Sequence, residues 1–200
     1  MANRTHNKAK NSRNGRHSNR VAGFPSHINS NISSTYKSVD IGTYDANISN
    51  IENWCRSQDM VHVQINGQFK NKAFVENVSE LLLETILPVK LRRAVSVDVW
   101  IYNAVEDQAG GYCWGDKDSV DIEIARTSDG YRYTREELLI NLTHELIHAK
   151  QFIAGELSPT TAKWKKGDYS KTPYSKQPWE REAYYWEKRL YEKFFKKLGA

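Results

Sequence analysis

The residues with the clearest chemical potential are His144, Glu145 and His148, which form the pattern H-E-x-x-H. Successive residues of an α-helix are rotated by about 100°, so two histidines four positions apart share one face, one turn apart. Two imidazoles in this arrangement can bind a single Zn²⁺, and the glutamate beside the first can act as general base on a water molecule at the metal. The motif therefore predicts one zinc ion, with Glu145 as the catalytic base.

A helix is expected around this motif, from Thr134 to Ala154. Thr134 and Glu137 fit a capping box at its start, and Gly155 follows its end. Its apolar side chains fall on the side opposite the histidine pair, at Leu139, Leu142, Leu146, Ala149 and Ile153. Solvated helix faces usually carry Lys, Glu or Arg, so we favour metal binding over a surface histidine pair.

A catalytic zinc ion needs a third protein ligand and leaves the fourth position to water. No histidine follows His148, so the ligand must be Glu, Asp or Cys. On the helix expected over 177–198, Glu180 lies at the centre of the inward apolar stripe and Glu182 on the polar face. A lone carboxylate on a buried stripe is costly unless paired or metal-bound. This favours Glu180 as the ligand, the alternative being an acid that complements the helix dipole. Glu187, also on the inner side, could partner a histidine nitrogen or form an ion pair.

The motif followed by Glu180, with Ala183 three positions later, resembles the gluzincin branch of zinc metallopeptidases. The small size and the run Pro-Trp-Glu-x-Glu-Ala from Pro178 are similar to minimal zincins, often encoded by phages and called SprT-like, whose third ligand is typically histidine. The resemblance covers about residues 119–190. It implies a zinc-dependent metalloendopeptidase that hydrolyses peptide bonds.

The resemblance also implies how a substrate would bind. In zincins an antiparallel edge strand beside the active-site helix pairs with the substrate backbone, which is a form of β-augmentation. The strand expected over 119–125 would take this role and contact the peptide through Val120, Asp121, Ile122 and Glu123. The same pattern is compatible with an ordinary strand of the sheet.

A hydrogen-bond donor must stabilise the oxyanion of peptide hydrolysis. The loop between the two helices supplies Tyr169 and Tyr174, which we rank equally as catalytic residues, with aromatic packing as the alternative. Residues 164–167, Trp-Lys-Lys-Gly, could form a flap over the site. Cys113 could ligate zinc and keep the enzyme latent, but a lone cysteine is more often a small buried residue.

Apolar periodicity predicts an α+β fold for residues 35–200, a minimal zincin-like domain. We expect a small mixed or antiparallel sheet, an active-site helix and a C-terminal helix that carries the third ligand. Besides the helices above, the pattern predicts helices over 48–57 and 71–86 and strands over 60–69, 94–102 and 119–125. Gly110 and Gly111 are expected to break the chain.

Residues 1–34 are rich in Asn, Ser, Arg and Lys, and we expect a disordered basic tail. Residues 1–20 hold six Arg or Lys and no acid, whereas the whole chain has a net charge of +5, so the rest is close to neutral. This tail could contact nucleic acid or another polyanion, or simply aid solubility. Two cysteines, no membrane-length apolar run and no signal sequence favour a cytoplasmic protein, in the host cytoplasm or a virion if phage-encoded.

Three functions are compatible with these features. The first is a zinc metallopeptidase that acts inside a cell. The second is a nucleic-acid-associated protein in which the basic tail recruits the zincin unit to proteins on DNA. The third is a structural or virion protein in which zinc only stabilises the fold.

Overall fold

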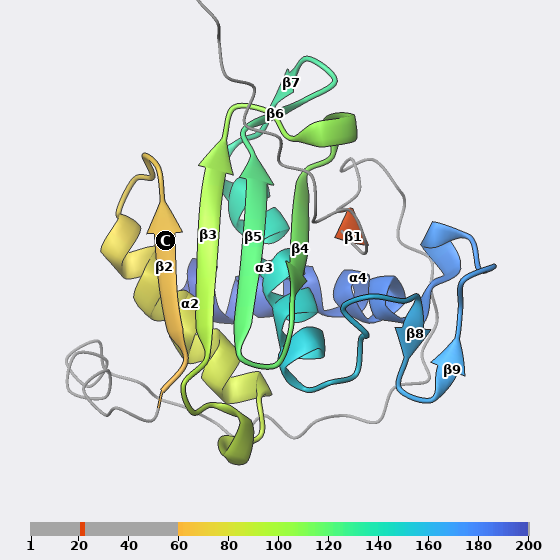
Figure 1. The fold of residues 1–200 in the computed structure, drawn as a ribbon. Helices are drawn as coiled ribbons and strands as arrows, with labels where there is room; N and C mark the ends of the chain where they lie inside the picture. The colour runs from red at the N-terminus through yellow and green to blue at the C-terminus, as the bar shows by residue number, and fades with distance from the viewer. Residues whose placement is uncertain (1–20, 23–59, 200) are drawn as a thin grey trace, which may run out of the picture.

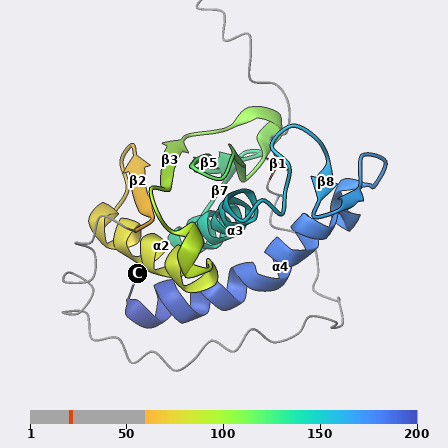
Figure 2. The ribbon, with the colours of Figure 1, turned by 60° about the horizontal axis from the view of Figure 1, so that its bottom comes forward.

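The computed structural model describes residues 21–22 and 60–199, which form an α+β fold (Figure 1). Two α-helices cover one face of a five-stranded mixed sheet, and a third α-helix lies beneath these two in Figure 2. The helix expected over 48–57 and nearly all of the tail over 1–34 lie outside the described residues. No helix in the described part of the chain is long and apolar enough to cross a membrane.

The sheet has the strand order β1-β4-β5-β3-β2. Its parallel part consists of β2 (His62–Asn66), β3 (Ser96–Tyr102) and β5 (Ser119–Ala125). β4 (Gly111–Gly115) runs antiparallel to β5, and β1 (Val21–Ala22) runs antiparallel to β4. β5 is therefore an interior strand, paired with β3 on one side and with β4 on the other.

The helices that pack on the sheet are α2 (Lys72–Ile86) and α3 (Arg135–Ile153), and α4 (Pro178–Leu190) packs against α3. α4 continues as the π-helical segment η4 (Tyr191–Lys196). The shorter elements are η1 (Val89–Leu91), η2 (Glu106–Gln108), β6 (Thr127–Ser128), β7 (Tyr131–Arg132), β8 (Lys163–Trp164), β9 (Gly167–Asp168) and η3 (Tyr174–Lys176). β6 pairs with β7, and β8 pairs with β9, in two small antiparallel hairpins.

Local sequence sets both ends of α3. The Thr134 hydroxyl accepts a hydrogen bond from the Glu137 amide, and the Glu137 carboxylate accepts one from the Thr134 amide, at 3.2 and 2.7 Å. This confirms the predicted capping box. At the other end Gly155 takes a left-handed conformation with φ 65°, which glycine adopts without steric cost. The caps fix the helix register that carries the histidine pair.

A single core lies between the sheet and the helices. The inner face of the parallel strands buries Val63, Ile65, Val97, Val99, Val120, Ile122 and Ile124. The helices contribute Val75, Val78, Leu82, Leu139, Leu142 and Leu146 to the same core. Because the leucines of α3 face the sheet, His144 and His148 lie on the side of α3 that meets α4.

The outer edge of β2 is protected by three carboxylates of α2, spaced one helical turn apart. They lie against alternate backbone amides of the edge strand, and the pairs are Glu76 with Ile65, Glu80 with Val63, and Glu84 with Val61. The first two hydrogen bonds measure 2.8 and 3.0 Å. Unpaired strand edges invite pairing with other chains, and these side chains close this edge of the sheet.

β4 and the β8–β9 hairpin were not predicted. Gly111 was expected to break the chain, but it begins β4. Glycine weakens a strand, yet it often occurs in one where a neighbouring element must approach the backbone closely. Residues 156–176, expected as a loop, contain the hairpin. Val21–Ala22 lie within the tail expected to be disordered, and they form β1.

Candidate metal centre

Helices α3 and α4 bring His144, His148 and Glu180 together in the interior of the fold. α3 supplies both histidines from adjacent turns, and the first turn of α4 supplies the glutamate. At most 3% of the surface of any of these residues is exposed. One ligand atom from each lies within 4.8 Å of the others. The predicted ligand set is therefore assembled as one buried cluster.

The distances in this cluster match those of a single tetrahedral metal site. The two histidine Nε2 atoms lie 3.1 Å apart. Glu180 Oε2 lies 3.5 Å from His144 Nε2, and Glu180 Oε1 lies 3.4 Å from His148 Nε2. Zinc bonds of about 2.0–2.1 Å at tetrahedral angles place neighbouring ligand atoms about 3.3 Å apart. Two nitrogens and one carboxylate oxygen are also the donor set of catalytic zinc sites.

A second layer of side chains orients the two imidazole rings. Glu187 Oε2 lies 2.6 Å from His144 Nδ1, which is the contact that helical phase had suggested for Glu187. Gln151 Oε1 lies 2.7 Å from His148 Nδ1. With both Nδ1 atoms donating to these acceptors, the Nε2 lone pairs face the centre of the cluster, as metal ligation requires.

Gln151 is a functional residue that the sequence analysis did not assign. Its amide nitrogen donates to the Trp179 carbonyl oxygen at 3.1 Å and to Glu182 Oε2 at 2.8 Å. These two contacts direct its oxygen toward His148. The available signal was its helical phase, because Gln151 lies on the same side of α3 as the histidines. Glu182, expected on a solvated face, is half-buried and belongs to this supporting network.

The charges of the cluster favour a bound cation. Burial opposes ionisation of Glu180, but His148 and His144 lower its pKa to about 2. Burial likewise disfavours a charged His144, but Glu180 and Glu187 raise its pKa to about 10. Both Glu180 oxygens are buried, and the two histidine Nε2 atoms face them at 3.5 and 3.4 Å. A buried ionised carboxylate needs a cationic partner, and a metal ion between these ligands would be one.

Glu145 lies beside the ligands on the same helix and is 1% exposed. Burial raises its pKa to about 7, although His144 and His148 act in the opposite direction. Its Oε2 is buried without a hydrogen-bond partner among the described residues. β4 approaches closely here: a Cβ on Gly111 would lie 2.9 Å from Glu145 Oε1. Only glycine therefore lets β4 run against the carboxylate.

The tyrosines around the metal-ligand cluster differ in the residues that they contact. Burial, and after it the nearby Glu180 carboxylate, raise the pKa of the Tyr174 phenol. The ring of Tyr184 lies 4.8 Å from the ring of His144. Tyr169, which directly follows β9, packs edge-on against Trp179 of α4, with ring centroids 6.0 Å apart. Tyr184, which was not ranked as a candidate, therefore joins Tyr174 at the centre.

The predicted substrate contacts require a correction. Val120, Asp121, Ile122 and Glu123 were expected on an edge strand, but every one pairs with β3 on one side and with β4 on the other. The backbone of β5 therefore has no free edge for a peptide, and Val120 and Ile122 are buried in the core. The strand that lies against Glu145 is β4. Cys113 on β4 is fully buried and is not a member of the ligand cluster.

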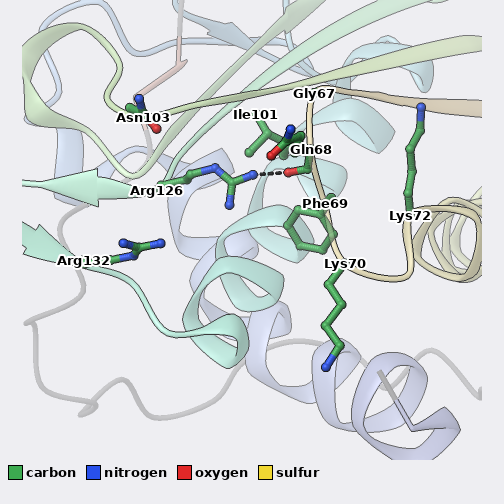
Figure 3. A pocket seen from close by; sticks show the side chains of 9 residues that line it. All are labelled: Gly67, Gln68, Phe69, Lys70, Lys72, Ile101, Asn103, Arg126 and Arg132. Carbon is green, nitrogen blue, oxygen red and sulfur yellow. Dashed lines mark hydrogen bonds between the residues drawn. The ribbon is translucent and has the colours of Figure 1, made fainter.

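A separate cavity of about 770 Å³ lies near the carboxyl ends of β2 and β3. Figure 3 shows the Arg126 and Arg132 side chains on one side of it and Phe69 on the other, with Arg126 donating to the Gln68 carbonyl oxygen. Lys70 and Lys72 add two further cations to its lining. No carboxylate, imidazole or thiol lines this cavity, and four Lys or Arg side chains do, so its charge does not favour a metal cation.

No protein-family model, curated protein or solved structure matches this chain. The functional interpretation therefore depends on the chemistry and geometry of the site.

Proposed function

We propose that the chain is a zinc-dependent peptidase of gluzincin type. The observation that carries the proposal is the position of Glu145, a buried carboxylate beside a three-ligand cluster on the same helix. Structural zinc sites are closed by four protein ligands, whereas catalytic sites use three and leave a position for water. His144, His148 and Glu180 form a three-ligand group, the pattern of a catalytic site.

Each residue of the site has a distinct role in the proposed hydrolysis. A zinc ion bound by the three ligands would supply a Lewis acid and lower the pKa of water. Glu145 takes the proton of the attacking water on its carboxylate and then delivers it to the leaving amine. One carboxyl group can perform both transfers, because it accepts a proton in the first step and returns it in the second.

Tyr174 and Tyr184 are the donors that we assign to the oxyanion. The raised pKa of Tyr174 means that its phenol keeps the proton and can donate it in a hydrogen bond. The contact of Tyr184 with His144 holds a second phenol beside the ligands. We assign Tyr169 a packing role, because its ring fills the space that Gly167 leaves open and abuts Trp179.

A substrate would bind in extended form along β4. This strand is antiparallel to its neighbour in the sheet and passes against Glu145 at Gly111. On the side away from β5, the described partner of β4 is the two-residue strand β1, which a peptide would displace. Backbone pairing of this kind gives affinity without strong side-chain selection. The role that the sequence suggested for the strand over 119–125 thus passes to β4.

The test compares wild-type protein with Glu145→Gln, both loaded with zinc and incubated with a peptide library. Wild type should cleave peptides, and the variant should bind zinc equally but cleave at least about 100-fold more slowly, since general bases contribute about 10²–10⁴-fold. Equal cleavage by the variant would refute the mechanism. Zinc binding without cleavage by wild type would instead indicate a structural metal.

A further inference from the structure

The backbone at the two sides of the sheet is covered by different kinds of groups. The edge at β2 is closed by side-chain carboxylates of α2, which lie against its outward backbone amides. The edge at β4 is met by backbone instead: Val21 pairs with Cys113 and Ala22 with Tyr112, in antiparallel register. Figure 1 shows β1, in red, beside β4 at this end of the sheet.

The edge that β1 covers is the one nearest the proposed catalytic carboxylate. Ala22 pairs with Tyr112, and the residue before Tyr112 in β4 is Gly111, where a Cβ would lie 2.9 Å from Glu145 Oε1. Glu145 and Glu180 also affect Cys113, the partner of Val21, since their charges and, above all, burial raise the pKa of its thiol. β1 is therefore placed on β4 where an extended peptide would have to pair to reach Glu145.

We propose that Val21–Ala22 is an intramolecular occupant of the substrate-binding edge, so that the N-terminal segment inhibits peptide binding in cis. The consequence for activity rests on the proposed peptidase function, whereas the docking of β1 on β4 does not. The occupant is a segment of this chain in extended form, and it uses the same antiparallel backbone pairing as a peptide substrate. Its inhibition is competitive, because substrate and β1 pair with the same strand.

The strength of this inhibition follows from the small size of β1. Two paired residues provide few backbone hydrogen bonds, each of modest net strength, so the free-energy difference between the docked and released forms is small. Substrate therefore displaces the segment at a modest cost. Releasing β1 permanently should lower KM about threefold to tenfold and leave kcat unchanged, since about 1.4 kcal/mol corresponds to tenfold in an equilibrium constant.

The experiment uses the full chain with a double substitution, Val21→Pro and Ala22→Pro. Proline lacks the backbone N–H and is poorly tolerated in a paired strand. The matched control is Ser18→Pro with Asn19→Pro, which changes the same tail outside β1 and keeps all its positive charges. Hydrogen exchange of residues 111–115 and steady-state cleavage kinetics are measured for wild type and both variants.

We expect faster exchange in β4 and a lower KM at constant kcat in the Val21/Ala22 variant alone. Unchanged exchange in β4 would overturn the docking of β1. Faster exchange with an unchanged KM would overturn the inhibition, because the edge would then not be where substrate binds. Absence of cleavage by all three proteins would refute the proposed function and, with it, the inhibitory role, while the exchange data would still decide whether β1 docks.

Discussion

Replacing Glu145 with glutamine should stabilise the metal-free protein at pH 8. Burial raises the pKa of Glu145 from 4.5 to about 7. The folded state therefore holds this proton more tightly than the unfolded state, so the associated stability is full below pH 4.5 and is lost as the pH rises to 7. The difference of about 2.5 pH units corresponds to about 3 kcal/mol. A buried amide costs roughly 1–2 kcal/mol to desolvate, which leaves a net gain of about 1–2 kcal/mol.

Urea unfolding followed by tryptophan fluorescence, with a chelator present, measures this difference at pH 4.5 and pH 8. Glu145→Gln should gain stability over wild type at pH 8 but not at pH 4.5. The matched control is Glu182→Gln, which should not gain stability at pH 8, because it removes the negative charge that lies 3.5 Å from Lys150 Nζ and keeps an oxygen that can accept from Gln151. If Glu145→Gln were no more stable than wild type at pH 8, the idea that burial disfavours the ionised carboxylate would be wrong.

Three further predictions concern the ligands and the close approach of β4. Glu180→Gln should lose bound zinc after dialysis, measured by elemental analysis, whereas Glu182→Gln should keep it; equal loss would contradict the ligand assignment. Glu187→Gln should weaken zinc binding about 10–100-fold in a chelator competition, because its carboxylate orients a ligating ring; an unchanged affinity would show that the ring is held by other contacts. Gly111→Ala should lower the free energy of unfolding by about 1–3 kcal/mol, because the new Cβ would lie 2.9 Å from the Glu123 carbonyl oxygen of β5 and 2.9 Å from Glu145 Oε1. A wild-type melting temperature would show instead that β4 can move away.

The ligand set could be predicted because helical phase is a local property. His144 and His148 share a helix face at any position in the fold. Glu180 comes close to them once its own helix face packs against that face. Apolar periodicity predicted the strands that became β2, β3 and β5 for the same reason, since alternation along a strand reflects burial of one face.

The elements that were missed have weak local signals. β4 begins and ends with glycine, a residue that favours turns, and its identity as a strand depends on pairing with β5. Gln151 has no chemical signature of its own, and its role follows from hydrogen bonds to Trp179 and Glu182 on another helix. Tyr174 and Tyr169 could not be distinguished from the sequence, because their distances from Glu180 depend on the path of the loop.

The sequence by itself determined which side chains can ligate a metal and which face of each helix carries them, because these properties repeat with the pitch of a helix. Only the tertiary structure decided which strand lies against Glu145 and what covers its edge. Strand order is set by packing between residues distant in the chain, so no local pattern could place β5 in the interior, β4 beside the carboxylate, and Val21–Ala22 on the outer edge of β4.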